Sequence, residues 1–427
     1  MCYAIPGKIT ELKGKIAVVD YFGEKRNVLN EFITLQRGDY VYAQGGIIVD
    51  KIPEKEAIEI LKLWKEQFFE LKKIDKRLAQ PAKISNAKNI LEILQKVNLK
   101  KELSKNELLD LLRLRDKSSL KLLYQTANNI RQKEHNNACC VHGIIEFSNY
   151  CKNNCLYCGI RKDRQIKRYR MDVDEITNVA RCAVNELGFK ALVLQSGEDY
   201  WYDEKKLYKI IKEIRKLNVL IFLSIGIRNK KTYQRLYKGG ARAILLRFET
   251  SNRRLFQELR PKTSFDERIE LIKFLKKIGY IVATGFLIGL PGETDEDIIN
   301  NILLTKSLNA DMYSFGPLIP ARGTPLENLK PVHEDVVLKT ISISRFVDRN
   351  SKILVTSALE TLEKDAKKKG LLAGANSLMI NVTPPHYKKL YELYPRLSDK
   401  DKEVEKNIKE TVNLLYSLGR APTDLGV

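Results

Sequence analysis

The feature that most constrains the fold is the regular alternation of short apolar runs with helical stretches after Val141. Eight runs are rich in β-branched and aromatic residues, and segments of helical period separate most of them. They lie at Ile144–Phe147, Ala191–Gln195, Val219–Ser224, Ala243–Arg247, Ile281–Ile288, Met312–Phe315, Ile353–Thr356 and Ser377–Ile380. This order predicts an α/β fold, a parallel sheet closed into a (β/α)8 TIM-type barrel, in which chemistry collects at the carboxyl ends of the strands.

Three cysteines follow the first of these runs, at that expected edge. Cys151, Cys155 and Cys158 form a C-x3-C-x2-C pattern. Thiolates are the ligands of iron–sulfur clusters, and three of them on one loop can hold a 4Fe–4S cluster with its fourth iron open. Zinc is the alternative, but it takes a fourth protein ligand, and the nearest histidine, His142, stands nine residues before Cys151. The pattern therefore favours the cluster, which Tyr157 is expected to shield.

An open iron suits the amino and carboxylate groups of S-adenosylmethionine, which a reduced cluster splits to give a 5′-deoxyadenosyl radical. Two later segments fit this cofactor. Gly197, Glu198 and Asp199 end the second run, where carboxylates can meet an amino group. The segment 285–293, which contains Gly289, ends the fifth run, where small residues admit a flat adenine. Glycines after strands also form simple turns, but the order of both segments after the cysteines favours the cofactor.

Arginine and carboxylate side chains stand near the end of the fourth run. Arg247 and Glu249 end it, and Arg268 follows on the next predicted helix. A guanidinium binds a carboxylate in fork geometry, so these residues are candidates to bind the cofactor. The alternative is a salt bridge at the rim of the barrel.

A separate module precedes the barrel. Residues 1–50 contain β-prone runs at Lys8–Thr10, Ile16–Val19 and Tyr40–Ala43, separated by glycines, which predicts a small β-barrel. Apolar residues at helical spacing over Glu54–Lys73 predict a helix that completes the module. The expected boundaries are a module at 1–75, a linker at 76–88, a helical lead-in at 89–135, the barrel at 136–385 and a C-terminal helical cap at 386–427.

Composition sets limits on the partners. The chain has no apolar run long enough to span a bilayer and no signal-peptide pattern at its start, so we expect a cytoplasmic protein without membrane contact. The net charge of +22 is compatible with nucleic-acid binding. However, no compact Lys/Arg block with interleaved aromatic residues occurs, which favours a lysine-rich solvated surface and no nucleic-acid partner. An acidic electron donor of the ferredoxin or flavodoxin type would also suit this charge.

Several of these segments resemble the HydE family, the radical S-adenosylmethionine maturases of FeFe-hydrogenase. The likeness covers about residues 90–427 and is carried by Ile144–Cys151, Cys155–Arg161, Leu194–Asp199, Leu245–Thr250, Leu259–Ser264, Gly316–Pro320, Gly374–Asn376, Thr383–Pro384 and Leu390–Pro395. It implies a complete (β/α)8 barrel, a 4Fe–4S cluster on the three cysteines, and other hydrogenase maturases or the hydrogenase apoprotein as partners. The implied substrate is a cysteine-bound iron carbonyl–cyanide species, whose sulfur the adenosyl radical attacks.

The resemblance also implies roles for individual side chains. Those expected to contact S-adenosylmethionine are Gln195, Ser224, Glu249 and Arg268, with Arg247 close by. Those expected to line the substrate cavity are Thr356 and Ser357, with Tyr394 near its far end.

The chain departs from the family pattern inside the predicted cavity. His142 and Ala243 stand where the family usually has arginines, so two anion-binding guanidiniums are missing and the exact substrate stays open. His142 is a candidate to donate a hydrogen bond to a cyanide-like ligand, or else a core histidine. No cysteine follows Cys182, so the second cluster of some family members is not expected.

The first module resembles the HypC family, small chaperones of NiFe-hydrogenase maturation, through Met1–Lys8, Ala17–Asp20 and Gly38–Tyr42. In that family the cysteine after the initiator methionine carries an iron with cyanide and carbonyl ligands. Cys2 matches that cysteine, while Gln44 replaces a histidine that the family uses. The combination predicts an iron carrier tethered to an enzyme, which would raise the effective concentration of an unstable iron species.

Two other functions are compatible with these patterns. One is a radical S-adenosylmethionine enzyme acting on a small organic substrate, as biotin synthase, methylornithine synthase and the maturases linked to iron-only hydrogenase do. The other is a non-catalytic iron carrier or assembly chaperone, against which the intact cysteine, Gly-Glu-Asp and arginine motifs count.

Overall fold

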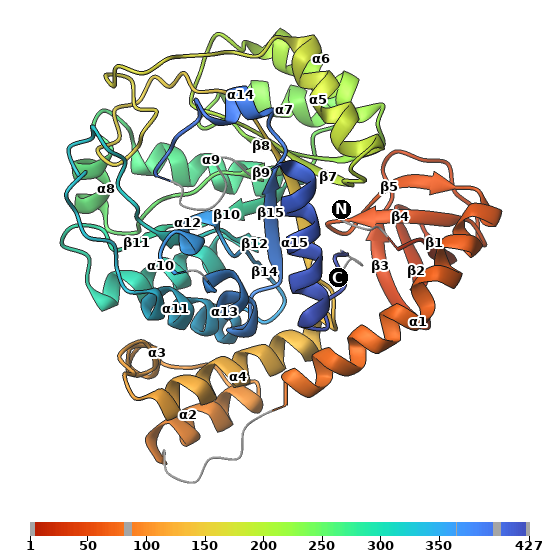
Figure 1. Cartoon of the computed structure of the whole chain (residues 1–427), viewed down its shortest axis with the longest axis horizontal. Coiled ribbons are helices and arrows are strands. Elements are labelled where there is room, and N and C mark those ends of the chain that lie inside the picture. The colour runs from red at the N-terminus through yellow and green to blue at the C-terminus, as the bar shows by residue number, and fades with distance from the viewer. Residues whose placement is uncertain (1–4, 81–87, 364, 396–402, 424–427) are drawn as a thin grey trace.

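The computed structural model describes residues 5–80, 88–363, 365–395 and 403–423 (Figure 1). Cys2 lies outside the described residues. The chain forms a small β-barrel at its N-terminal end and a large α/β barrel beside it, with helices crossing between the two (Figure 1).

The strands of the small barrel are β1 (Gly7–Lys13), β2 (Ile16–Tyr21), β3 (Glu24–Leu29), β4 (Tyr40–Gln44) and β5 (Ile47–Ile52). They close in the order β1-β2-β3-β5-β4, so the predicted small β-barrel is confirmed. β3 and β5 were not predicted. β3 is mostly polar and buries only Val28, whereas β5 is apolar and follows β4 directly after the Gly45–Gly46 turn. Gly45 and Gly46 join β4 to β5 with φ angles of +60° and +77°. Positive φ at both central residues is typical of the two-residue turn that fits strand twist.

The helices that follow are α1 (Glu54–Leu78), α2 (Lys88–Asn98), α3 (Lys105–Leu112) and α4 (Lys117–His135). α1 begins where the apolar spacing predicts, but it continues past Lys73 because Asp75 is buried and bound by Arg131 of α4. The stretch expected to be a linker from residue 76 therefore starts inside α1.

The strands of the large barrel are β6 (Cys140–Ser148), β7 (Ala191–Ser196), β8 (Leu220–Ser224), β9 (Ala243–Leu245), β10 (Ile281–Thr284), β12 (Met312–Tyr313), β14 (Lys352–Ile353) and β15 (Ser377–Asn381). Neighbours pair in parallel in the order β14-β12-β10-β9-β8-β7-β6-β15. A parallel bridge between Leu354 and Ser377 joins the two ends. The predicted (β/α)8 barrel is confirmed.

The remaining helices are α5 (Val173–Asn185), α6 (Glu204–Arg215), α7 (Lys230–Gly239), α8 (Arg253–Leu259), α9 (Phe265–Lys277), α10 (Asp295–Ser307), α11 (Glu334–Val347), α12 (Ser357–Glu360), α13 (Ala366–Leu372), α14 (Pro385–Lys388) and α15 (Val404–Ser417). None of the described helices is both long and apolar enough to cross a membrane.

The fifth run differs from its prediction as one strand over Ile281–Ile288. It divides into β10 and β11 (Leu287–Ile288), which pairs with β13 (Gly316–Pro317). Gly285 separates the two parts, and a Cβ atom there would lie 2.3 Å from the carbonyl oxygen of Ser314. The backbone of the next strand therefore crowds this position, and only glycine fits.

Candidate active site

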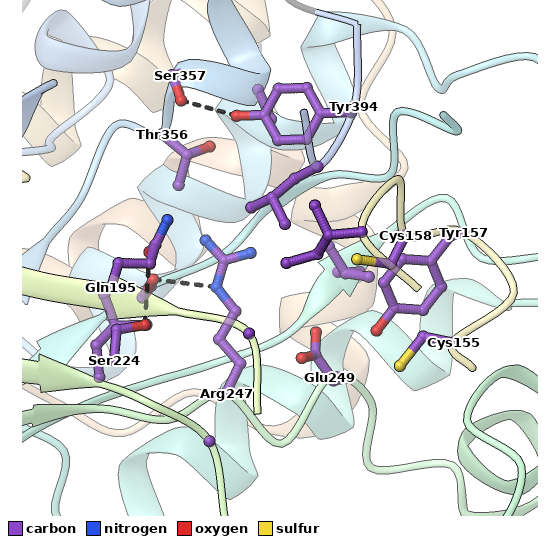
Figure 2. A pocket seen from close by; sticks show the side chains of 18 of the residues that line it. Cys155, Tyr157, Cys158, Gln195, Ser224, Arg247, Glu249, Thr356, Ser357 and Tyr394 are labelled. Atoms are coloured by element: carbon purple, nitrogen blue, oxygen red, sulfur yellow. Dashed lines mark hydrogen bonds between the residues drawn. The ribbon is translucent and has the colours of Figure 1, made fainter. Parts of the chain in front are cut away.

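A cavity of about 310 Å³ lies inside the large barrel at the carboxyl ends of its strands. Most of the predicted site residues line it, although they come from segments far apart in the sequence. Those that it brings together are Cys151, Cys155, Tyr157, Cys158, Gln195, Gly197, Glu198, Ser224, Arg247, Glu249, Arg268, Thr356, Ser357 and Tyr394. Figure 2 shows the cysteine side facing Arg247 and Glu249, with Ser357 and Tyr394 on a further wall.

The cysteine loop packs directly against the end of β7. The Cys151 Sγ atom accepts a hydrogen bond from the backbone N–H of Glu198 at 3.4 Å. A Cβ atom at Gly197 would lie 2.2 Å from the carbonyl oxygen of Tyr150 and 2.8 Å from the Cβ of Cys151. Glycine at 197 therefore allows the loop and the strand end to meet.

The three thiols form an environment that requires positive charge. Burial raises the pKa of Cys151, Cys155 and Cys158. The charge of Cys155 raises the pKa of Cys151 further, and the charges of Cys155 and Cys151 raise that of Cys158. Arg260 opposes this at Cys155 and favours the thiolate. The irons of a cluster supply the positive charge that buried thiolates need, so this donor set fits a 4Fe–4S cluster.

The spacing of the donors bears on the zinc alternative. Among the residues that the structure describes, no three His, Cys, Asp or Glu side chains converge on a point that one metal ion could occupy. The ligands of a zinc ion all lie about 2.0–2.3 Å from one centre. The cysteine sulfurs are thus spaced unlike a mononuclear zinc site.

Arg268 is 4% exposed and connects two predicted site residues. Its Nη2 atom lies 3.2 Å from Glu198 Oε1, and its Nη1 donates to the carbonyl oxygen of Arg247 at 2.9 Å. Burial lowers the pKa of Arg268, as does the charge of Arg260, whereas Glu198 raises it. Arg268 therefore forms a salt bridge with Glu198 at the end of β7, and both side chains line the cavity.

Arg260 connects the cysteine loop to the carboxylates. Its Nη1 atom donates to the Tyr157 hydroxyl at 3.0 Å and to Glu249 Oε1 at 3.4 Å. Burial lowers the pKa of Arg260, but Cys155, Tyr157 and Glu249 outweigh it and hold the pKa well above its usual value. Glu249 has a φ of +73°, a conformation that costs a residue other than glycine on the order of 1–3 kcal/mol. Such strain is often found at functional positions, and Glu249 combines it with a place in the cavity lining.

Four polar side chains form one wall of the cavity: Gln195 of β7, Ser224 of β8, Arg247 after β9 and Ser314 after β12. The Ser224 hydroxyl donates to Gln195 Oε1 at 3.4 Å. Arg247 Nε donates to the Ser314 hydroxyl at 3.1 Å, and this leaves the rest of its guanidinium facing the cavity (Figure 2). This wall presents donors and acceptors to a polar ligand.

A second polar wall comes from the segment after β14 and from the region near the C-terminal end. The hydroxyls of Ser357 and Tyr394 lie 2.7 Å apart (Figure 2). Thr356 is 8% exposed, and its Oγ1 atom would lie 2.2 Å from a Cβ atom at Gly316. Glycine at 316 thus makes room for the Thr356 hydroxyl at the cavity wall.

Two predicted cofactor residues do not line the cavity. Asp199 turns away because its carboxylate accepts hydrogen bonds from the Ser148 hydroxyl at 2.7 Å and from Arg170 at 2.7 and 3.0 Å. The Gly289 N–H donates to Glu293 Oε2 at 2.6 Å, within a turn outside the lining residues. Gly289 and Asp199 therefore shape the loops around the cavity instead of meeting a ligand there.

His142 also lies elsewhere than expected. It does not reach the main cavity but lines a second one, where its ring lies 4.9 Å from that of Phe222. His142 precedes Ile144 by two residues on the same face of β6. Because Ile144 lines the main cavity, His142 lies one level lower in the barrel.

Two buried charged residues were missed as site residues. Arg260 directly follows α8 in the segment Leu259–Ser264. Only the path of the folded chain around α8 brings it beside the cysteines. Glu146 is 1% exposed, lines the cavity, and accepts a hydrogen bond from Asn381 Nδ2 at 2.7 Å. A carboxylate within an otherwise apolar strand was the available signal for Glu146.

Family models match three parts of the chain. The Radical SAM superfamily matches residues 145–304, which include the cysteine loop. The HupF/HypC family matches residues 1–64, and the Biotin and Thiamin Synthesis associated domain matches residues 314–421.

Individual proteins extend the similarity over most of the chain. The chain is 40% identical over 305 residues to the [FeFe] hydrogenase maturase subunit HydE of Thermotoga maritima, covering 71% of this chain and 87% of the relative. It is 31% identical over 330 residues to 3-methylornithine synthase of Methanosarcina barkeri, covering 75% of this chain and 91% of the relative. The crystal structure of methylornithine synthase (PylB) superposes with a TM-score of 0.68 at 28% identity, over 78% of this chain and 97% of that one. The crystal structure of the hydrogenase maturase HydG superposes with a TM-score of 0.67 at 18% identity, over 84% of this chain and 78% of that one. At this identity the similarity supports the fold alone.

Proposed function

The chain belongs to the HydE family of radical S-adenosylmethionine enzymes, and on this basis we propose that it processes a cysteine-bound iron carbonyl–cyanide species during assembly of a hydrogenase active site. The observation that carries the proposal is one cavity in which three thiols face carboxylates, guanidiniums and hydroxyls. Alternating cationic and anionic groups suit an anionic metal complex beside a zwitterionic cofactor.

Cys151, Cys155 and Cys158 would hold the 4Fe–4S cluster. When bound, the reduced cluster supplies the electron that splits S-adenosylmethionine into methionine and a 5′-deoxyadenosyl radical. Tyr157 and Arg260 cover the loop from one side, since the Tyr157 hydroxyl is bonded to Arg260 at 3.0 Å. These side chains exclude water from the reacting atoms.

Glu249, Arg268, Gln195 and Ser224 would bind S-adenosylmethionine. The Glu249 carboxylate suits the cationic part of the cofactor, and the Arg268 guanidinium suits its carboxylate. The hydrogen bond between Ser224 and Gln195 at 3.4 Å orients the Gln195 amide. Glu198 holds Arg268 in place from the opposite side at 3.2 Å.

Arg247, Thr356, Ser357 and Tyr394 would meet the substrate. Cyanide ligands accept hydrogen bonds, and hydroxyl and guanidinium groups donate them. Ala243 is fully buried in an apolar cluster with Phe222 and Met312 and does not line the main cavity, whereas Arg247 does and would bind an anionic complex there. This change from the family pattern favours a substrate with less negative charge or fewer cyanides.

The N-terminal domain would carry the iron species on Cys2. The match to the HupF/HypC family over residues 1–64 supports this role. The carrier would then be tethered to the enzyme that uses its cargo, and tethering replaces a bimolecular encounter by an intramolecular one.

A comparison of substrates tests the proposal. The reconstituted, reduced full chain would be incubated with S-adenosylmethionine and, in separate reactions, with a cysteine-ligated iron carbonyl–cyanide complex, with L-lysine, or with no substrate. We expect 5′-deoxyadenosyl transfer to sulfur, detected by mass spectrometry, only with the iron complex. Turnover of L-lysine would instead indicate methylornithine-type chemistry, and the absence of S-adenosylmethionine cleavage in every reaction would indicate a non-catalytic carrier.

We also propose that an acidic ferredoxin or flavodoxin docks beside the cysteine loop. Lys162 donates its backbone N–H to the carbonyl of Asn153 at 2.8 Å, and the carbonyl of Lys167 accepts from Asn149 at 2.9 Å, so both exposed lysines adjoin this loop. Trp201 is 43% exposed, and Arg170 lies over its ring at 5.4 Å and over the ring of Tyr150, the residue before Cys151, at 3.7 Å. Cationic side chains around an exposed aromatic residue suit an acidic protein surface.

The double substitution Lys162→Glu and Lys167→Glu is expected to slow reduction by an acidic ferredoxin about tenfold at low salt, because electrostatic steering is lost. The difference from the wild type should shrink at high salt. Reduction by dithionite, which needs no docking, should be unchanged. The matched control is Lys62→Glu with Lys65→Glu on the exposed face of α1; an equal effect of both pairs would indicate that only net charge matters.

A further inference from the structure

The segment that follows the three cysteines packs back against the loop that carries them. Asn149, two residues before Cys151, binds the backbone on both sides of Arg168. Its Nδ2 atom donates to the carbonyl oxygen of Lys167 at 2.9 Å, and its Oδ1 atom accepts from the N–H of Tyr169 at 2.8 Å. These two bonds fix the backbone of Arg168 relative to the start of the cysteine loop.

The half-buried guanidinium of Arg168 donates to five backbone carbonyl oxygens, which lie on both sides of the cysteines in the sequence. Nη1 binds two of these oxygens and Nη2 binds three. They belong to Asn149 (2.5 Å), Ile160 (2.9 Å), Arg161 (2.5 Å), Lys162 (3.4 Å) and Arg164 (3.1 Å). A single planar side chain with a fixed fork of donors thus joins the two ends of the cysteine loop.

One of the peptide groups fixed in this way directs its N–H at a cysteine sulfur. Burial raises the pKa of Cys158, and the backbone N–H of Ile160 opposes this rise by donating to the thiolate. Arg164 Nη1 binds the carbonyl oxygen of Gly159, in the same peptide group, at 2.8 Å. Arg168 binds the carbonyl oxygen of Ile160, in the next peptide group. The two guanidiniums therefore fix the direction of the N–H that reaches the sulfur.

The charge of Arg168 also acts on two of the thiols. Burial lowers the pKa of Arg168, whereas the thiolates of Cys151 and Cys158 raise it. The same attraction stabilises those thiolates. Arg168 is not among the residues that line the main cavity, so it acts from behind the loop, while Arg260 acts on Cys155 from within the cavity.

We propose that Arg168 is a positioning residue for the 4Fe–4S cluster, which holds the cysteine loop in its ligand-binding shape and makes the cluster easier to reduce. Reduction adds one electron from the reduced donor and changes no bond of the protein. Hydrogen bonds to the sulfurs and the net charge around a cluster set its reduction potential, and a nearby cation favours the form with more negative charge. The inference concerns the cluster alone, so it does not depend on the substrate or on the carrier role proposed above.

A redox titration followed by electron paramagnetic resonance tests the effect on reduction. Arg168→Gln keeps all three thiols but removes the cation and most of the carbonyl contacts. We expect about tenfold less reduced cluster at a given donor potential, which for one electron is a shift of about 59 mV to a more negative midpoint. Arg168→Lys keeps the charge but not the fork, so its midpoint should lie between those of Arg168→Gln and the wild type.

Hydrogen exchange of the apoprotein tests the positioning role without the cluster. The amides of residues 159–164 should exchange faster in both Arg168 variants than in the wild type, while those of β8 should be unchanged. Arg181→Gln is the matched control, because Arg181 is exposed on α5 and binds Asn178 at 2.8 Å, away from the cysteine loop. It removes the same charge and should change neither the midpoint nor the exchange.

Three results would overturn the inference. One is a wild-type midpoint together with wild-type exchange in Arg168→Gln. Another is faster exchange with an unchanged midpoint, since Arg168 would then shape the loop without affecting reduction. The third is an equal shift of the midpoint in Arg181→Gln, which would show that only the net charge matters. None of these results contradicts the proposed function, which fails instead if the wild type forms no cluster at all.

Discussion

Replacing Cys155 by alanine is expected to abolish formation of 5′-deoxyadenosine. Cys155 is 6% exposed and lies beside Arg260, whose charge favours the thiolate form. Among the described residues, no other thiol lines the main cavity, since Cys139, Cys140 and Cys182 lie outside it. Two thiolates hold a cubane poorly, so the variant should lose both the cluster and cleavage of the cofactor.

The measurements are iron content, the visible absorption of the anaerobically reconstituted protein, and 5′-deoxyadenosine by liquid chromatography. Cys182→Ala is the control, because Cys182 lies on α5 and contacts Glu186 at 3.4 Å outside the cavity. It should retain full activity. Cleavage of S-adenosylmethionine by the Cys155 variant at the wild-type rate would show that this cysteine is not a ligand.

The barrel and the cysteine site are the parts that pattern alone predicts well. Alternation of β-prone and helical segments is a local property, so the order of strands follows once handedness and short connections are assumed. The cysteines are close in sequence, so their shared loop needs no knowledge of the fold. Shorter elements are harder: β12 and β14 have two residues each, because their apolar runs continue into the loops that form the cavity.

Side chains whose role depends on a distant contact could not be predicted in this way. Asp199 reads like Glu198 in the sequence, yet Arg170 binds Asp199 and leaves only Glu198 at the cavity. Arg260 becomes a site residue only because α8 returns toward the cysteine loop. The position of the N-terminal domain is a further case. Tyr40 and Tyr42 alternate as in any half-buried strand, and the local sequence does not indicate that the large barrel covers them.

Replacing Asp75 by asparagine is expected to destabilise the folded chain by about 3–5 kcal/mol, the cost of leaving buried charge without its partner. The Asp75 carboxylate accepts hydrogen bonds from Arg131 at 2.7 and 2.8 Å and lies 2.9 Å from Arg420 Nε. All three side chains are at most 1% exposed. They join α1 to α4 and to the segment after α15, so they connect the N-terminal domain to the barrel.

The size of the effect follows from the two guanidiniums. Burial lowers the pKa of Arg420 to about 10, and repulsion by Arg131 contributes to this shift, while Asp75 opposes it. Asparagine keeps the shape but not the charge, so the two cations would repel each other in a site that water does not reach. Gly419 adds to the constraint, because a Cβ atom there would lie 2.2 Å from the Asp75 backbone nitrogen. Helix α1 therefore cannot move away from Gly419 without losing this packing.

Urea unfolding followed by circular dichroism measures the change in the free energy of unfolding. The control is Lys73→Ala, two residues earlier on α1, which removes an exposed ion pair with Glu70 at 2.9 Å and should change stability little, since solvent screens such pairs. Equal effects of the two substitutions would show that the buried ion pairs do not hold the domains together. A large loss for Asp75→Asn alone would show that the buried ion pairs of Asp75 with Arg131 and Arg420 hold α1, and with it the N-terminal domain, to the rest of the chain.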